Sequence, residues 1–124
     1  MSEKSLQRSA GAHHWRATLA DAKAAPIPEG ARSALLMHHG SMKVRYYAPM
    51  STDTQQPHEQ DEIYVIASGS GTFVNGDDRV PFEPGDVLFV PAQQVHRFED
   101  FTDDFATWVV FYGPRGGEGA EDDA

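Results

Sequence analysis

The sequence of 124 residues contains no cysteine, and this absence excludes both disulfide bonds and metal sites built from thiolates. Without cysteine, the composition does not indicate a redox compartment. The sequence also lacks a long apolar run. Residues 1–10 are polar, which excludes a signal peptide there, and no stretch approaches the length of a membrane span. We therefore expect a cytoplasmic protein.

Basic residues are scarce. Lys and Arg number 10 against 19 Asp and Glu, and the formal net charge is −9. This balance argues against a nucleic-acid partner, because a phosphate backbone needs a basic surface. It also disfavours binding to anionic membranes. The remaining class is a soluble protein, and a hydrophobic share of 40% is enough for one modest core.

The length fits one folded domain, and changes in composition divide the chain into three parts. Residues 1–30 form an N-terminal arm, in which the spacing of Trp15, Leu19 and Ala22 predicts a short helix over residues 13–25. We expect Trp15 to anchor this helix on the main domain or on a second subunit. Residues 31–113 form the main domain. Residues 114–124, rich in Gly and acidic side chains, are expected to form a disordered tail.

The main domain reads as a series of short strands separated by Gly and Pro turns, which indicates an all-β antiparallel sandwich or barrel. Asn75-Gly76 predicts a tight hairpin turn. The apolar run Val87–Val90 predicts a fully buried strand. Five apolar side chains are candidates for a pocket wall, although core packing is the interpretation we favour for most of them: Phe89, Phe98, Trp108, Val110 and Tyr112. The expected strands cover residues 34–38, 42–47, 62–68, 72–74, 79–82, 87–90, 96–99 and 105–112.

One stretch gathers residues suited to a metal ion. Side chains two and four apart in an extended chain share a face, so Gln56, His58, Glu62 and Tyr64 would point to one side. Further along, a Pro84-Gly85-Asp86 turn opens a strand, and His96 begins the next strand. Two imidazoles and a carboxylate suit a divalent ion, whereas burying them unpaired would be costly.

Together these two stretches resemble the paired motifs of the cupin superfamily. His58, Glu62 and Gly69 match the first motif, and Gly85, Pro91 and His96 match the second. Three positions depart from the pattern. Gln56 replaces the first histidine, Gln93 replaces a glycine, and Asp100 replaces an asparagine. The resemblance implies a small single-domain cupin whose fold is a jelly-roll β-barrel.

The resemblance further implies that His58, Glu62 and His96 hold Fe, Mn, Ni, Co or Zn, whose identity stays open. Gln56 would be a fourth ligand through its amide oxygen, or would orient a bound water. Tyr64 would point into the same cavity and transfer protons if its pKa were lowered, or would simply line the pocket. Small cupin lyases that cleave dimethylsulfoniopropionate look similar at this Glu-x-Tyr pattern.

Two functions fit these residues. The first is a metal-dependent enzyme, a dioxygenase or an isomerase or lyase, acting on a small organic molecule. The second is a non-catalytic cupin that binds a small ligand or acts as a sensor, with a structural or lost metal. Lys43 and Arg45 share one strand face, which is either an exposed face, the reading we favour, or an anion-binding wall inside the barrel. The resemblance also implies a homodimer.

Overall fold

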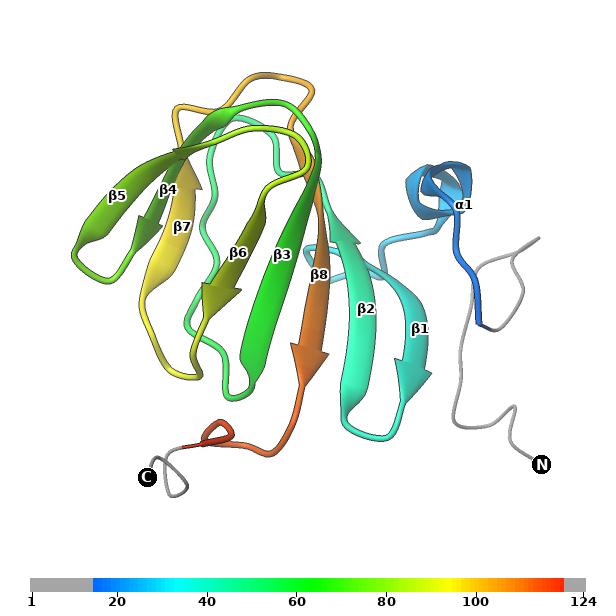
Figure 1. Ribbon diagram of the computed structural model, residues 1–124. Helices are drawn as coiled ribbons and strands as arrows, with labels where there is room; N and C mark the ends of the chain where they lie inside the picture. Colours follow the sequence, from blue (N-terminus) through cyan, green and yellow to red (C-terminus); the bar gives the residue numbers. More distant parts are fainter. Residues whose placement is uncertain (1–14, 120–124) are drawn as a thin grey trace.

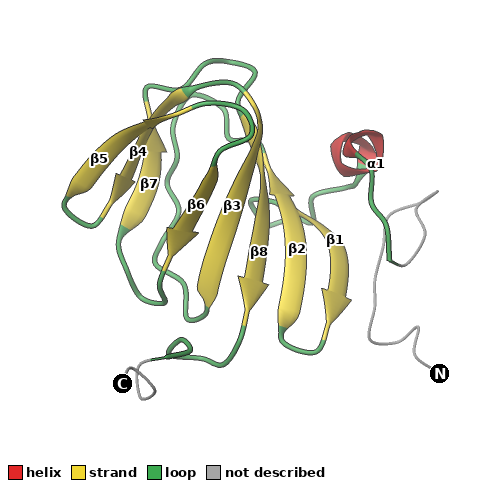
Figure 2. Cartoon of the chain, in the orientation of Figure 1, coloured by secondary structure: helices red, strands yellow, loops and turns green. Residues whose placement is uncertain are grey.

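The computed structural model describes residues 15–119, and within this range eight antiparallel strands form two sheets (Figures 1 and 2). The larger sheet contains, in spatial order, β1 (Ala34–His39), β2 (Met42–Tyr47), β8 (Ala106–Tyr112), β3 (Asp61–Ser68) and β6 (Val87–Val90). The smaller sheet contains β5 (Asp78–Phe82), β4 (Gly71–Asn75) and β7 (His96–Glu99). The prediction of an all-β antiparallel jelly roll with a short N-terminal helix is confirmed.

The main core lies between the two sheets and is built largely from aromatic rings. Phe98 of β7 stands at its centre, with ring centroids 4.9 Å from Tyr64 and 4.7 Å from Phe105. Full burial of such side chains stabilises a fold by about 1.5–3 kcal/mol each. Because alternate residues of a strand face the same side, the inward face that buries Tyr64 and Ile66 also carries Glu62. A carboxylate is thereby fixed inside the fold.

The N-terminal helix is shorter than predicted. Helix α1 covers Leu19–Ala24, and it begins there because Thr18 and Asp21 form a capping box that satisfies the first free N–H groups. Ala22 is its buried residue. The helix packs near β1 and β2 (Figure 1). Trp15 precedes the helix and is 70% exposed, so it is not buried in the main domain, and its predicted role as an anchor there stays a prediction. Its role toward a second subunit stays a prediction.

The burial predicted for strand β6 is also wrong. The run Val87–Val90 was predicted to be fully buried, but Val87 is 65% exposed and Phe89 is 50% exposed. The reason is position, because β6 is an edge strand of the larger sheet and only its inner face, with Leu88 and Val90, packs on the core. Phe89 is therefore no part of the core wall, whereas Phe98 is buried as expected.

The segment after β8 lies against the start of β3. The carboxylate of Asp61 accepts a hydrogen bond from the backbone N–H of Glu118 at 2.8 Å, and Gly116 donates to the carbonyl of Glu59 at 2.7 Å. The first part of the segment expected as a disordered tail is therefore in contact with the domain. Residues 1–14 and 120–124 lie outside the described range. The first two residues of the predicted helix, 13 and 14, are among them. No helix within residues 15–119 has the length and apolarity to cross a membrane.

Candidate metal centre

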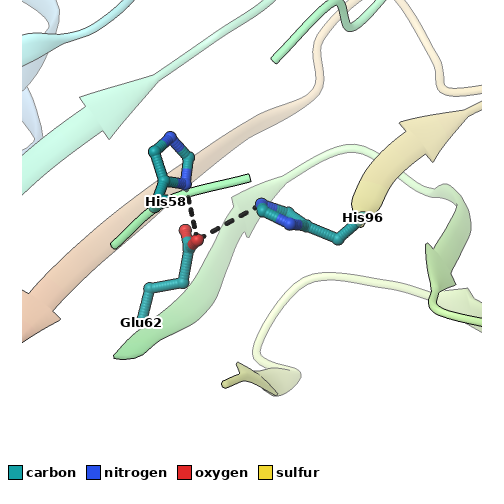
Figure 3. A group of neighbouring side chains, drawn as sticks. All are labelled: His58, Glu62 and His96. Atoms are coloured by element: carbon teal, nitrogen blue, oxygen red, sulfur yellow. Dashed lines mark hydrogen bonds and ion pairs between the residues drawn. The ribbon is translucent and has the colours of Figure 1, made fainter. Parts of the chain in front are cut away.

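Three side chains from separate parts of the chain converge between the sheets (Figure 3). Glu62 comes from β3, His96 begins β7 on the opposite sheet, and His58 lies in the loop that leads into β3. The Nδ1 atom of His58 is 2.7 Å from Oε2 of Glu62, and Nε2 of His96 is 3.2 Å from the same oxygen. Their potential ligand atoms all lie within 4.8 Å of one another. This group could hold a metal ion.

Backbone contacts hold the two histidine segments together. The backbone N–H of Gln93 donates to the carbonyl of His58 at 2.7 Å, which joins the loop before β3 to the loop before β7. Gln93 adopts a φ of 71°, in the left-handed region that favours glycine. Its position is the one where the resemblance expects glycine. The backbone geometry of the motif is thus kept, at a small conformational cost, although the residue has changed.

The buried atoms of the group fit a cation. Nδ1 of His96 donates to the carbonyl of Gln94 at 2.8 Å, because a carbonyl can only accept. In the neutral ring the lone pair is then on Nε2, which points toward Glu62. Within residues 15–119, both His96 Nε2 and Glu62 Oε1 are buried and have no hydrogen-bond partner. Buried polar atoms without partners are costly, and a divalent ion would satisfy both.

The negative charge of Glu62 and the positive charge of a protonated His96 stabilise each other. Burial disfavours the ionised carboxylate of Glu62, but contacts with His58 and His96 outweigh burial and lower its pKa to about 2. Burial likewise disfavours a charged His96, but the carboxylate of Glu62 and the Gln94 carbonyl outweigh it and raise the pKa of His96. Glu62 is therefore negative at neutral pH, which is the state that a metal ligand requires.

Tyr64 lies two residues beyond Glu62 on the same inner face and is fully buried. Its hydroxyl donates to Oε1 of Gln55 at 3.0 Å. Burial and the negative charge of Glu62 raise the pKa of Tyr64 well above its usual value of 10.0. The lowered pKa that the sequence-based hypothesis required is thus not present, and Tyr64 is a neutral phenol that can donate a hydrogen bond.

Gln56 lies in the loop before His58 and its side chain is exposed. The amide that faces inward is that of its neighbour, Gln55, which bonds to Tyr64 and to the carboxylate of Asp53. The loop breaks the strict alternation of an extended strand, so the predicted shared face for Gln56 does not follow. Sequence analysis missed Gln55 and Asp53, because neither belongs to the recognised motif.

An open cavity of about 670 Å³ adjoins His58, whose side chain is one-third exposed. Phe111 forms part of the wall and packs edge-on against the His58 ring, with centroids 4.8 Å apart. A smaller cavity of about 60 Å³ lies on the Gln55 side of the same two rings. Lys43 and Arg45 line the larger cavity. From the sequence we favoured the interpretation that these residues lie on an exposed face, and the structure instead supports the alternative that they form a cavity wall.

The sequence profile of the Cupin domain family matches residues 43–112, which is more than half of the chain. The chain belongs to the cupin family. A relative from Streptomyces coelicolor, an uncharacterized protein, is 37% identical to this cupin over 77 residues, covering 60% of this chain and 73% of the relative. That relative carries no stated activity.

Solved structures agree with the fold of this cupin. A Cupin 2 conserved barrel domain protein from Salinispora arenicola is 20% identical, with a TM-score of 0.60, over 79% of this chain and 87% of that chain. A chain from the structures of the DMSP lyases RdDddP and RnDddQII is 23% identical, with a TM-score of 0.55, over 68% of this chain and 49% of that chain. At these identities the likeness shows the fold alone.

Proposed function

We propose that this cupin is a metal-dependent enzyme that acts on a small organic molecule, by dioxygenation or by isomerase or lyase chemistry. His58, Glu62 and His96 would hold one divalent ion, of Fe, Mn, Ni, Co or Zn. The observation that carries this proposal is a pair of buried atoms without a hydrogen-bond partner, Oε1 of the negative Glu62 carboxylate and Nε2 of His96. A purely structural core has no need of such a pair.

Two His and one carboxylate leave further coordination positions free for a substrate. When bound, the ion would act as a Lewis acid or, in the case of iron, would support oxidation by dioxygen. His58 is the ligand that the large cavity reaches, so a substrate in this cavity would approach the ion from the His58 side.

Tyr64 and Gln55 would act as hydrogen-bonding groups on the inner side of the centre. Because Tyr64 keeps its proton, it would donate to a reacting oxygen rather than remove a proton. Gln55 holds the phenol in place and is itself held by Asp53. Gln56 stays our proposed fourth ligand or water-orienting residue, and either role requires its exposed side chain to turn inward.

The first test is elemental analysis of untagged protein beside three variants. His58→Ala removes a proposed ligand, and His38→Ala is the matched control, because His38 lines the same cavity outside the ligand group. We expect near-stoichiometric metal in the wild type and in His38→Ala, and loss of metal in His58→Ala. A Gln56→His variant that keeps metal through longer dialysis against a chelator would support a ligand role at this position.

The second test separates an enzyme from a ligand-binding or sensor cupin. Metal-loaded protein is incubated with a bacterial metabolite extract, and mass spectrometry records which small molecules are consumed. Consumption by the wild type but not by His58→Ala supports the enzyme. Retained metal without consumption supports the non-catalytic alternative. Protein that takes up no metal under any loading condition would rule out the proposal.

A further inference from the structure

The strand register aligns two cations with the metal centre on the inner face of the larger sheet. Lys43 in β2 pairs with Phe111 in β8, and Phe111 pairs with Glu62 in β3. Two residues further along each strand, Arg45 pairs with Val109, and Val109 pairs with Tyr64. Each cation therefore stands two strands from a residue of the centre, a Cα separation of roughly 10 Å. A Lys or Arg side chain can span much of that distance.

The cavity has a charge opposite to that of the protein. The chain carries 10 Lys and Arg against 19 Asp and Glu, yet the cavity is lined by Lys43, Arg45 and Arg115 and by one acid, Glu59. Glu59 is already paired with Arg115, whose Nε lies 2.5 Å from its carboxylate. Among the cavity residues, Lys43 and Arg45 are thus the cations without a carboxylate partner in the described range.

Arg45 is half-buried and lines the cavity. Its Nη1 donates weakly to the carbonyl and hydroxyl oxygens of Ser33, at 3.4 and 3.3 Å. Burial lowers the pKa of this guanidinium, although it stays charged at neutral pH. A partly desolvated cation without a counter-charge is unfavourable, and an anion in the cavity would offset this cost.

We propose that this cavity binds a small organic anion, whose carboxylate or phosphate group is held by Lys43 and Arg45 while the rest of the molecule reaches His58. This inference deepens the proposed function and rests on it for the identity of the ligand as a substrate. It assigns the substrate to the organic acids or phosphate esters. It also gives the two cations the role of binding residues, whereas the centre itself carries out the chemistry.

The test measures binding of succinate, citrate and inorganic phosphate to the zinc-loaded and metal-free protein, with succinamide as the neutral match for succinate. Calorimetry gives the affinity, and backbone NMR shifts locate the site. The variants are Lys43→Gln with Arg45→Gln, the charge-conserving pair Lys43→Arg with Arg45→Lys, and Lys23→Gln. Lys23 is exposed on α1, away from the cavity, and serves as the control. Thermal melting confirms that each variant folds.

We expect at least one anion to shift the amide signals of Lys43, Arg45 and Phe111 and to bind at least tenfold more tightly than succinamide. The double glutamine variant should lose about tenfold in affinity for each charged hydrogen bond removed. The charge-conserving pair should keep most of the binding, and Lys23→Gln should match the wild type. Preference for succinate over phosphate, or the reverse, identifies the anionic group as carboxylate or phosphate.

The proposal would be overturned if none of the three anions bound more tightly than succinamide, or if the double glutamine variant bound anions like Lys23→Gln. Binding of none of the three anions would overturn it too. The two proposals fail separately. If the wild type takes up no metal but its anion binding still depends on Lys43 and Arg45, the anion site stands and the metal-dependent function falls. If metal binds and anion binding does not depend on these residues, the metal-dependent function stands and the anion site falls.

Discussion

The hydroxyl of Tyr64 donates a hydrogen bond to the side-chain oxygen of Gln55 across 3.0 Å, inside the fold. This contact joins the loop before β3 to the strand that carries Glu62. Replacing Tyr64 by Phe removes the donor and leaves the Gln55 oxygen unsatisfied, so we expect the free energy of unfolding to fall by about 1–3 kcal/mol. Urea unfolding measures the change. Tyr112→Phe, at the half-exposed end of β8, is the control, and equal losses in both variants would contradict the prediction.

The same contact shows how far the sequence could predict the site. Residue spacing in a strand correctly predicted that Glu62 and Tyr64 share a face, because β3 is regular there. The motif spacing suggested that His58 and His96 would meet Glu62, and the structure brings the three together. The neighbouring amide was assigned to Gln56 rather than Gln55, because residues before β3 form a loop whose turns no periodicity describes.

Burial of edge positions was harder to predict. An apolar run such as Val87–Val90 has the same composition in a central strand and in an edge strand, and only the sheet order places β6 at an edge. The helix start depended on a capping box at Thr18 and Asp21, which is a local signal present in the sequence. The cavity wall at Lys43 and Arg45 required knowledge of which sheet face is inward, and alternation alone cannot supply it.

Asp53 holds the loop that carries Gln55. Its carboxylate accepts hydrogen bonds from the hydroxyl of Tyr47, from the backbone and side-chain N–H groups of Gln55, and from the backbone N–H of Phe98 at 2.8 Å. In Asp53→Ala several partly buried donors lose their acceptor, each at a cost of about 1–3 kcal/mol if it stays unsatisfied. We expect the free energy of unfolding to fall by about 2–4 kcal/mol, as measured by chemical denaturation.

Asp86→Ala is the matched control for Asp53→Ala. Asp86 also accepts a backbone hydrogen bond, from Glu83 at 2.9 Å, but this bond is exposed and water can replace the acceptor. The expected loss is at most about 1 kcal/mol. An Asp53→Ala variant no less stable than Asp86→Ala would show that the loop does not depend on this carboxylate.

Gly69, a motif glycine at the turn from β3 to β4, is required for two reasons. Its φ is +82°, and a Cβ atom there would lie 2.4 Å from Cα of Phe105, which is backbone and cannot move aside. Left-handed backbone costs about 1–2 kcal/mol for a residue with a side chain, and forced overpacking adds about 1–3 kcal/mol. We expect Gly69→Ala to lose about 2–5 kcal/mol of stability, or to fail to fold.

The other motif glycine at a turn separates these two costs. Gly85 has a φ of +91°, but a Cβ atom there would meet nothing within 4 Å. Gly85→Ala should therefore lose only the backbone term, about 1–2 kcal/mol. Thermal and urea unfolding of both variants provide the comparison. If Gly85→Ala proved as damaging as Gly69→Ala, the contact with Phe105 would not be the reason that glycine is needed at position 69.

The final prediction concerns the pH dependence of the metal-free protein. The pKa of Glu62 is lowered from 4.5 to about 2, so the folded state binds fewer protons than the unfolded chain in that interval, and stability is lost as pH falls through it. The pKa of His96 is raised above 6.5, so the folded state binds more protons above that value, and stability is lost as pH rises. The contribution of the pair is therefore greatest between pH 4.5 and 6.5.

Glu62→Gln removes the carboxylate whose own pKa is lowered and which contributes to the raised pKa of His96, so it isolates this contribution. The stability difference between the wild type and Glu62→Gln, measured by urea unfolding in chelator from pH 3 to pH 9, should be largest near pH 5–6 and should shrink on both sides. Zinc added in place of the chelator should raise the stability of the wild type only above the pKa of His96. The reason is that metal binding needs a neutral His96 and favours the folded state. A difference that stays constant across the range would show that Glu62 and His96 are not coupled in the folded protein.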